Sequence, residues 1–322
     1  MNMHAPALAK VQSFDEQTPF AGDVLDDLSQ HPKRLSPKYF YDAAGSELFE
    51  QITLLPEYYP TRTELSILRD RGSAIAATIP EGAALVEFGA GATTKVRLLL
   101  NECALGAYVP VDISSDFLKA QAEALRQDFT GLAVYPVAAD FTAPFALPDV
   151  IAGMPKVGFF PGSTLGNFEP HEACAFLRSA RDILGQDAQL VIGVDLEKDE
   201  RVLYEAYNDK AGVTARFNLN VLHRINRELG GNFDLSAFTH RAIYNRERRR
   251  IEMHLISRKA QTVRVLGRSF SFRAGESIHT ENSYKYSLER FTALARGTGW
   301  TPRESWTDAA AMFSVHALVA SD

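Results

Sequence analysis

The sequence predicts an α/β fold: a Rossmann-like, seven-stranded domain covered by helices, accompanied by a second α+β domain. Short apolar runs alternate with helical repeats from residue 62 to residue 196, which is typical of buried parallel strands joined by helices. A Gly-x-Gly turn follows the first of these runs. The alternation stops at residue 197 and resumes at 287–322. The segment between, 197–286, is too long for a simple connection between two elements, which indicates a second domain. We therefore assign 62–196 and 287–322 to the Rossmann-like domain, and 10–61 and 197–286 to the second domain.

The first strand and its turn organise the rest of the chain. An apolar run ends at Glu87, Gly89 and Gly91 follow, and helical spacing begins after Thr93. Glycines let the backbone approach a ligand closely, and free N–H groups at a helix start favour an electron-rich group. The turn is therefore a candidate nucleotide cradle, with a plain strand-to-helix turn as an equal alternative at this point.

The details of the turn discriminate between nucleotides. A dinucleotide fingerprint needs a third glycine where this chain has Thr94, which disfavours NAD and FAD. Glu87, directly before the turn, looks instead like the first motif of S-adenosylmethionine-dependent methyltransferases. An NAD-dependent oxidoreductase is thus the disfavoured alternative.

The next two strands each end in an acidic residue. The strand at 108–112 ends at Asp112, where a carboxylate would accept hydrogen bonds from ribose hydroxyls. The strand at 133–139 leads into Asp140 and Phe141, an acid and an apolar ring that would meet the adenine of a methyltransferase cofactor. An aspartate that merely starts a turn is nearly as good an explanation of Asp140 by itself.

The remaining elements complete the predicted sheet. A strand at 157–160 enters the glycine-containing loop 161–168, which lies where open α/β sheets bind ligands. A helix at 171–184 and a fifth strand at 189–196 follow, and the carboxyl-terminal part supplies a helix at 288–294 and two closing strands, 297–306 and 313–320. The segment 197–286 carries two helical patterns followed by alternating strand patterns, which predicts an α+β domain.

Composition narrows the function classes. The net charge is −6, which is unlike the basic surface of a nucleic-acid binder, so a small-molecule substrate is expected. The two cysteines, Cys103 and Cys174, show no metal-ligand spacing, so we predict no metal site. The sequence shows no signal peptide and no apolar run of membrane-spanning length, and we therefore expect a cytoplasmic protein with no membrane partner. We also expect a monomer.

Several separated motifs together resemble the histidine-specific Nα-methyltransferases of ergothioneine biosynthesis, over nearly the whole chain from about residue 35. The motifs are Phe40-Tyr41-Asp42, Leu55 to Glu64, Glu87 to Lys95, Gly162 to Asn167, Tyr207 with Gly212 to Ala215 and Phe217-Asn218, Ile251-Glu252-Met253, and Thr280 to Ser283. The resemblance implies S-adenosylmethionine as cofactor and three successive methylations of the α-amino group of L-histidine, giving hercynine. It also implies a Rossmann-like methyltransferase domain and a separate substrate-binding domain.

The resemblance also implies roles for individual residues. The residues implied to bind the cofactor are Glu87, Gly89, Gly91, Lys95, Asp112, Asp140 and Phe141. Those implied to surround the amino and carboxylate groups of histidine are Tyr41, Tyr58, Asn167 and Tyr207, of which Tyr41, Tyr58 and Asn167 are the catalytic candidates; Gly162 would line the same cavity. Those implied to surround the imidazole are Phe217, Met253, Glu281 and Ser283. Two alternatives stay open, namely the same scaffold acting on another amino acid and a non-catalytic adenosine-binding module.

Overall fold

The computed structural model describes residues 18–321, apart from the side chains of Asp116 and Phe117. The described chain forms two compact units. We call residues 50–211, 242–252 and 282–321 the sheet unit, and residues 18–49, 212–241 and 253–281 the smaller unit. Each is described separately below.

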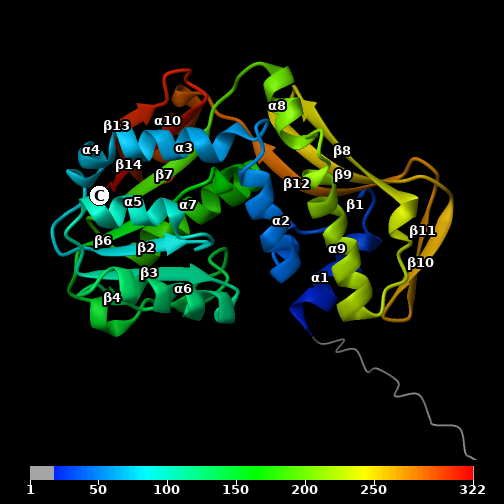
Figure 1. Ribbon diagram of the computed structural model, residues 1–322, viewed down its shortest axis with the longest axis horizontal. Coiled ribbons are helices and arrows are strands. Elements are labelled where there is room, and N and C mark those ends of the chain that lie inside the picture. The colour runs from blue at the N-terminus through cyan, green and yellow to red at the C-terminus, as the bar shows by residue number, and fades with distance from the viewer. Residues whose placement is uncertain (1–17, 322) are drawn as a thin grey trace, which may run out of the picture. The chain divides into compact units, whose positions relative to one another are not determined.

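The sheet unit is built on one large sheet with the strand order β13-β14-β7-β6-β2-β3-β4, and β5 also pairs with β3. Its strands are β2 (Ala84–Phe88), β3 (Ala107–Asp112), β4 (Ala133–Val134), β5 (Val137–Ala138), β6 (Lys156–Phe160), β7 (Gln189–Asp195), β13 (Trp300–Thr307) and β14 (Phe313–Ala320). All pairings from β4 and β5 to β7 are parallel, whereas β14 is antiparallel to both β7 and β13. This is a Rossmann-like sheet, with the predicted closing antiparallel pair at one edge (Figure 1).

One predicted strand is divided in the structure. The sequence predicts a single strand at 133–139, but β4 and β5 are two short strands separated by Tyr135 and Pro136. Proline has no N–H to donate to a neighbouring strand, so the ladder is interrupted there. The sheet therefore has eight strands in seven positions.

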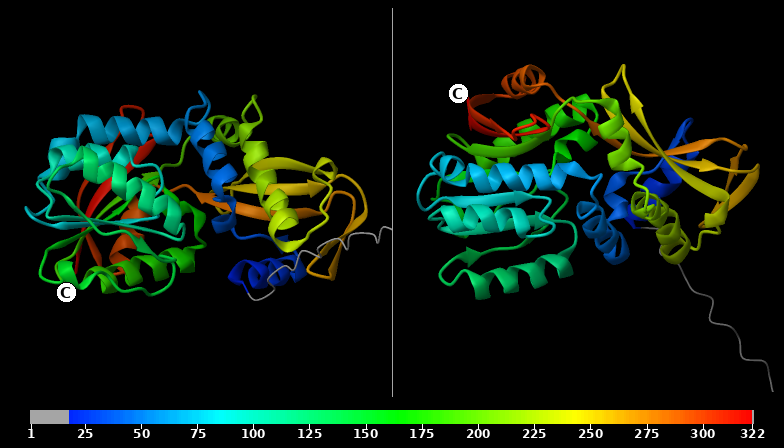
Figure 2. Two further views of the ribbon diagram at one scale, coloured as in Figure 1. Left: turned by 60° about the horizontal axis from the view of Figure 1, so that its bottom comes forward. Right: turned by 45° about the horizontal axis from the view of Figure 1, so that its top comes forward.

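Helices cover both faces of this sheet (Figures 1 and 2). One apolar core lies between the sheet and the helices α3 (Tyr59–Asp70), α4 (Gly72–Ala76), α5 (Thr94–Glu102) and α6 (Ser115–Asp128). The other core lies beneath α7 (Pro170–Leu184) and α10 (Leu288–Gly297). Successive residues of the buried strands alternate between these two cores, because side chains on a strand point to opposite faces. The sheet unit also contains η2 (Asp149–Ile151), η3 (Thr164–Asn167) and α8 (Glu200–Tyr207).

The smaller unit contains α1 (Pro19–Ser29), η1 (Pro37–Phe40), α9 (Val213–Leu229), η4 (Leu235–Ala237) and the hairpin of β10 (Gln261–Val265) and β11 (Arg268–Phe272). A four-stranded sheet has the order β1-β12-β9-β8, with β1 (Lys33–Arg34), β8 (Phe238–Asn245), β9 (Arg250–Ser257) and β12 (Ser277–Tyr284). The unit boundaries fall within β8, β9 and β12, and also within α2 (Ala43–Thr53). The α+β class predicted for the insert agrees with these elements.

The bounds of the two units differ from those of the two predicted domains. Residues 50–61, 197–211, 242–252 and 282–286 belong to the sheet unit, whereas the sequence assigns them to the second domain. Residues 10–17 of that predicted domain lie outside the described part of the chain. The division of labour between a cofactor domain and a substrate domain stays a prediction.

A buried carboxylate holds α3 against the sheet. Glu64 on α3 is 1% exposed and accepts the N–H of Gly162 at 2.9 Å on each carboxylate oxygen. A Cβ added at Gly193 of β7 would lie 2.1 Å from Glu64 Oε1. Only glycine at position 193 leaves room for this carboxylate.

We therefore expect Gly193→Ala to lower the free energy of unfolding by about 1–3 kcal/mol, because the added methyl displaces the buried Glu64 carboxylate. Urea unfolding followed by circular dichroism measures the change. Gly297→Ala is the matched control, since an added Cβ there meets nothing within 4 Å. Equal stabilities of the Gly193→Ala variant and the wild type would contradict this packing.

Candidate functional site

The glycine turn after β2 is open to a ligand. Gly89 has a φ of 72°, a conformation that favours glycine, and the N–H groups of Gly89 and Ala90 donate to the Val111 carbonyl at 2.9 and 3.0 Å. A Cβ at Gly91 would meet nothing within 4 Å, whereas one at Gly89 would lie 3.1 Å from the Phe141 ring. The turn is thus fixed to β3 on one side and open on the other.

Glu87 lies buried directly beneath this turn. It is 3% exposed, and its carboxylate accepts a hydrogen bond from the Tyr108 hydroxyl at 2.5 Å. Burial raises the pKa of Glu87 to about 7, although the Tyr108 hydrogen bond and the charge of Lys95 both act in the opposite direction. This carboxyl therefore titrates near neutral pH.

Lys95 connects the turn to the loop at 161–168. Its Nζ lies 2.6 Å from Glu64 Oε2, and the same carboxylate accepts the Gly162 N–H. Gly162 has a φ of 82°, and a Cβ there would lie 3.2 Å from Lys95 Nζ. Glu64 thus joins a predicted cofactor residue, Lys95, to a predicted substrate residue, Gly162. The motif that ends at Glu64 implied no separate role for this residue.

Two predicted cofactor carboxylates follow neighbouring strands. Asp112 ends β3 and pairs with Ala138 of β5, two residues before Asp140. The Asp112 carboxylate accepts the Ser114 N–H at 2.9 Å, and burial raises its pKa. Asp140 accepts the Thr142 N–H at 2.9 Å. Carboxyl ends of parallel strands lie at one edge of a sheet, so both carboxylates belong to the edge where α/β folds bind nucleotides.

The aromatic ring beside this edge is anchored in the core. Phe141 lies edge-on to Phe160 and Phe176, with ring centroids 5.7 and 5.9 Å apart. Together the open turn, the acidic strand ends and this ring fit S-adenosylmethionine, because its ribose hydroxyls need acceptors and its adenine needs an apolar face. Within the described residues no cluster of three or more histidine, cysteine, aspartate or glutamate side chains could hold a metal ion.

Three predicted substrate residues of the sheet unit lie close together. The rings of Tyr58 and Tyr207 lie edge to face with centroids 6.2 Å apart, and the Tyr207 hydroxyl donates to Ser283 Oγ at 2.8 Å. Tyr58 immediately precedes α3, and Tyr207 ends α8. The catalytic candidate Asn167 ends η3 in the loop after β6, where Ser163 has a φ of 57°.

Beside these residues lies a buried charged cluster that no sequence motif predicted, which we call the Asp195 cluster: Tyr59, Asp195, Lys198 and Lys285. Asp195 is 1% exposed and accepts hydrogen bonds from the Tyr59 hydroxyl at 2.7 and 2.9 Å, from Lys285 at 2.7 Å, and from Lys198. Burial acts to raise the pKa of Asp195, but the charges of Lys285 and Lys198 outweigh it and hold the pKa below its ordinary value. An aspartate at the end of an apolar strand was the sequence signal that could have identified this cluster.

In the smaller unit, Tyr41 and Phe217 belong to one aromatic group. Their ring centroids are 5.7 Å apart, Tyr41 also lies 5.6 Å from Phe49, and Phe217 of α9 lies 4.7 Å from Phe40. Tyr41 is 37% exposed, whereas Phe217 is buried.

The other two predicted residues of this unit lie on neighbouring strands. Met253 of β9 is buried, and its carbonyl accepts the Thr280 hydroxyl of β12 at 3.1 Å. Glu281 follows Thr280, and its carbonyl lies 3.1 Å from His279 Nε2. Met253 and Glu281 therefore lie on neighbouring strands of the four-stranded sheet.

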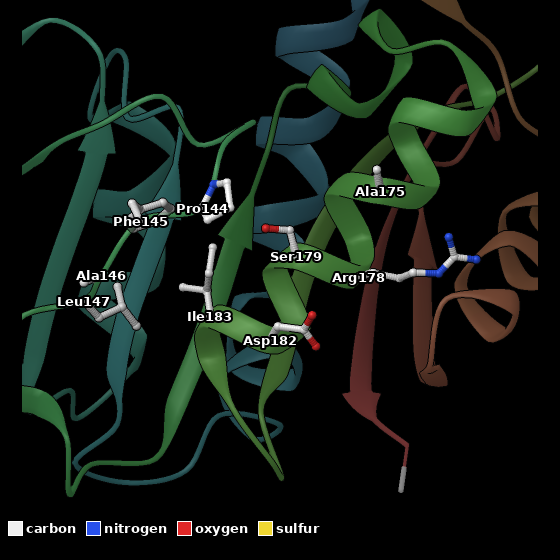
Figure 3. A pocket seen from close by; sticks show the side chains of 9 residues that line it. All are labelled: Pro144, Phe145, Ala146, Leu147, Ala175, Arg178, Ser179, Asp182 and Ile183. Atoms are coloured by element: carbon white, nitrogen blue, oxygen red, sulfur yellow. The ribbon is translucent and has the colours of Figure 1, made fainter.

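A hollow of about 540 Å³ in the sheet unit contains none of the predicted site residues. It is lined by residues 144–147 and by α7, with Ser179 and Ile183 directed toward Pro144 and Phe145 (Figure 3). No predicted motif falls in it.

The sheet order and the open, acid-flanked turn define a nucleotide-binding enzyme of the S-adenosylmethionine-dependent methyltransferase class. More particularly, the chain belongs to the family described as "Histidine-specific methyltransferase, SAM-dependent", whose model matches residues 20–320. It is 42% identical to the histidine N-alpha-methyltransferase of Mycolicibacterium smegmatis, covering 92% of this chain and 94% of that protein. The enzyme of the same name from Mycobacterium tuberculosis is 40% identical over 91% of this chain and 92% of its own length.

A fungal protein extends the comparison. The chain is 31% identical to ergothioneine biosynthesis protein 1 of Neurospora crassa, covering 86% of this chain but only 32% of that longer protein. The predicted family and the predicted fold class are thus confirmed, as is S-adenosylmethionine as the cofactor.

The raised pKa of Glu87 predicts a pH-dependent penalty on stability. Unfolding returns this carboxyl to its ordinary pKa of 4.5, so the unfolded chain loses the proton at lower pH than the folded chain. Below pH 4.5 the carboxyl therefore costs the folded state nothing. As the pH rises from 4.5 to about 7, it lowers the free energy of unfolding progressively. Glu87→Gln removes this titration while keeping an acceptor for Tyr108. We expect the stability of Glu87→Gln relative to the wild type to rise by up to about 3 kcal/mol between pH 4.5 and pH 8.

Chemical denaturation at several pH values measures this difference. Asp149→Asn serves as the control, because it neutralises a carboxylate on η2, well away from the turn in sequence. A Glu87→Gln curve parallel to that of the wild type would contradict the raised pKa.

Proposed function

We propose that this chain transfers methyl groups from S-adenosylmethionine to the α-amino group of L-histidine, three times in succession, to give hercynine for ergothioneine biosynthesis. The observation that carries the proposal is the 42% identity to a histidine N-alpha-methyltransferase over nearly the full length of both chains. The cofactor turn and the polar group of Tyr58, Tyr207 and Ser283 supply geometry that this reaction can use.

The cofactor supplies an electrophilic methyl group on a sulfonium. We assign its ribose to Asp112, its adenine to Asp140 and Phe141, and its amino acid part to the turn of Gly89 and Gly91. Glu87 beneath the turn and Lys95 beside it would set the local charge. The open space at Gly91 supports this assignment.

The remaining polar residues would orient the nucleophile. Methyl transfer needs a neutral amine aligned with the sulfonium methyl, and correct orientation is worth roughly 7–11 kcal/mol in favourable systems. We assign this positioning to Tyr41, Tyr58 and Asn167, and the carboxylate to Tyr207. An uncharged shell suits the reaction, because a carboxylate in its place would favour the protonated amine, which cannot attack the methyl group. Tyrosine faces would also receive the cation that forms as methyl groups accumulate.

Histidine selectivity would come from a second set of side chains. Glu281 is the candidate acceptor for the imidazole N–H, Ser283 the candidate partner of the other ring nitrogen, and Phe217 and Met253 the apolar walls. Gly162 would line the same cavity. A buried acceptor penalises ligands that lack the matching donor, because its own hydrogen bond is then unmade.

The family establishes a small-molecule substrate. We further propose that the enzyme acts as a monomer in the cytoplasm without a membrane partner. The net charge of −6 argues against a nucleic-acid partner, and the two unpaired cysteines fit a reducing compartment. Within residues 18–321 no helix is long and apolar enough to cross a bilayer.

Substrate turnover tests the proposal directly. We expect the wild-type enzyme to methylate histidine but neither leucine nor phenylalanine, because neither offers a ring N–H to Glu281. Glu281→Ala should lower kcat/KM for histidine about 100-fold, as expected when a charge-assisted hydrogen bond is lost. Initial rates of S-adenosylhomocysteine formation with each amino acid measure both effects.

Glu281→Gln is the matched variant, because it keeps the size of the side chain and removes its charge. An intermediate loss is expected, since an amide oxygen still accepts the imidazole N–H but more weakly. Equal wild-type turnover of leucine and histidine, or an unaltered histidine preference in Glu281→Ala, would remove Glu281 from this role.

A further inference from the structure

We propose that Lys285 is a positioning residue: it fixes the direction of the hydrogen bonds of Tyr207 and Ser283, so that Ser283 presents its proton to the substrate. This deepens the proposed function and rests on it, because it takes Tyr207 and Ser283 to be substrate-binding residues. The resemblance gives Lys285 no role.

The contacts of Lys285 account for all of its protons. Its side chain is 0% exposed, and Nζ donates to Asp195 Oδ2 at 2.7 Å, to Ser283 Oγ at 2.7 Å and to the Tyr207 hydroxyl at 3.1 Å. An ammonium group has three N–H donors and no acceptor. The lysine therefore acts only as a donor, and it occupies one lone pair on the Tyr207 oxygen and one on Ser283 Oγ.

These contacts determine what Ser283 can still do. Ser283 Oγ accepts one hydrogen bond from Lys285 and a second from the Tyr207 hydroxyl at 2.8 Å. A serine hydroxyl has two acceptor sites and one proton, so both acceptor sites are filled. Ser283 is left with its own proton to donate, and the ligand atom opposite must be an acceptor.

The imidazole of histidine offers the acceptor that a donating Ser283 needs. A neutral imidazole has one N–H donor and one unprotonated nitrogen acceptor. With Glu281 as the acceptor for the N–H, a donor is needed for the second nitrogen. Ser283 fulfils that need while Lys285 fills one of its acceptor sites and Tyr207 fills the other. Without the lysine, the serine proton could turn toward the Tyr207 oxygen.

Variants at position 285 test the inference through histidine affinity. Lys285→Met removes the donor but keeps the length, and Asp195 retains Lys198 and Tyr59 as partners. We expect Lys285→Met to raise the Kd and KM for histidine about 10-fold or more, as for loss of a charge-assisted hydrogen bond. The values of kcat and of the Kd for S-adenosylmethionine should change by less than about three-fold.

Lys198→Met is the matched control, because Lys198 also pairs with Asp195 but its hydrogen bonds run to Tyr59, Asp195 and the Leu196 carbonyl. It should leave the histidine KM within about two-fold of the wild type while costing similar stability. If Lys285→Met fails to fold, the double variant Lys285→Met/Asp195→Asn removes the cation together with its counter-charge. That variant should show the same rise in Kd.

A double-mutant cycle separates positioning from general structural damage. In a Ser283→Ala background the route from Lys285 to the substrate is absent, so Lys285→Met should change the histidine Kd by less than about three-fold. A full further rise in that background, or an unchanged Kd in Lys285→Met alone, would overturn the inference. Failure of the proposed function would show differently, as a wild-type enzyme that does not turn over histidine.

Discussion

The sheet unit depends above all on one buried carboxylate held between two lysines. Asp195 ends β7 and accepts hydrogen bonds from the start of α3, through Tyr59, and from Lys285 just after β12. Its own N–H donates to Ser163 in the loop after β6. Replacing Asp195 would leave two buried ammonium groups without their counter-charge, and breaking a buried ion pair in this way costs about 3–5 kcal/mol. Asp195 of β7 thereby joins three distant segments: its side chain binds Tyr59 and Lys285, and its backbone N–H binds the loop that carries Asn167.

Glu64 provides a second, parallel restraint. It lies on the same helix as Tyr59, accepts the backbone N–H of Gly162, and pairs with Lys95 beside the glycine turn. The Glu64 carboxylate therefore holds the loop at 161–168 at Gly162, and the backbone N–H of Asp195 holds it at Ser163. A loop so restrained is pre-organised, which is what a reaction dominated by orientation requires.

Much of the fold could be predicted from the sequence, because strand patterns and the turn at Gly89 are local features. The seven-stranded class and its closing antiparallel pair followed from these patterns, whereas the break at Pro136 and the bounds of the two units did not. The pairing of Asp195 with Lys285 could not be predicted, since 90 residues separate them and neither belongs to a spacing motif. The sequence placed Glu64 in a motif but did not predict that it is a buried carboxylate. Its burial needs the space left by Gly193, which is 129 positions away in the sequence. The roles of Tyr41, Phe217 and Glu281 toward histidine stay predictions.

The central claim is that the chain methylates the α-amino group of histidine. Mass spectrometry of histidine incubated with the enzyme and S-adenosylmethionine carrying a deuterated methyl group tests it most directly, with fragmentation locating the label. We predict successive mono-, di- and trimethylated products, each labelled on the α-nitrogen and none on the imidazole. Label on a ring nitrogen, or histidine recovered unlabelled while another amino acid gains the methyl groups, would contradict the account.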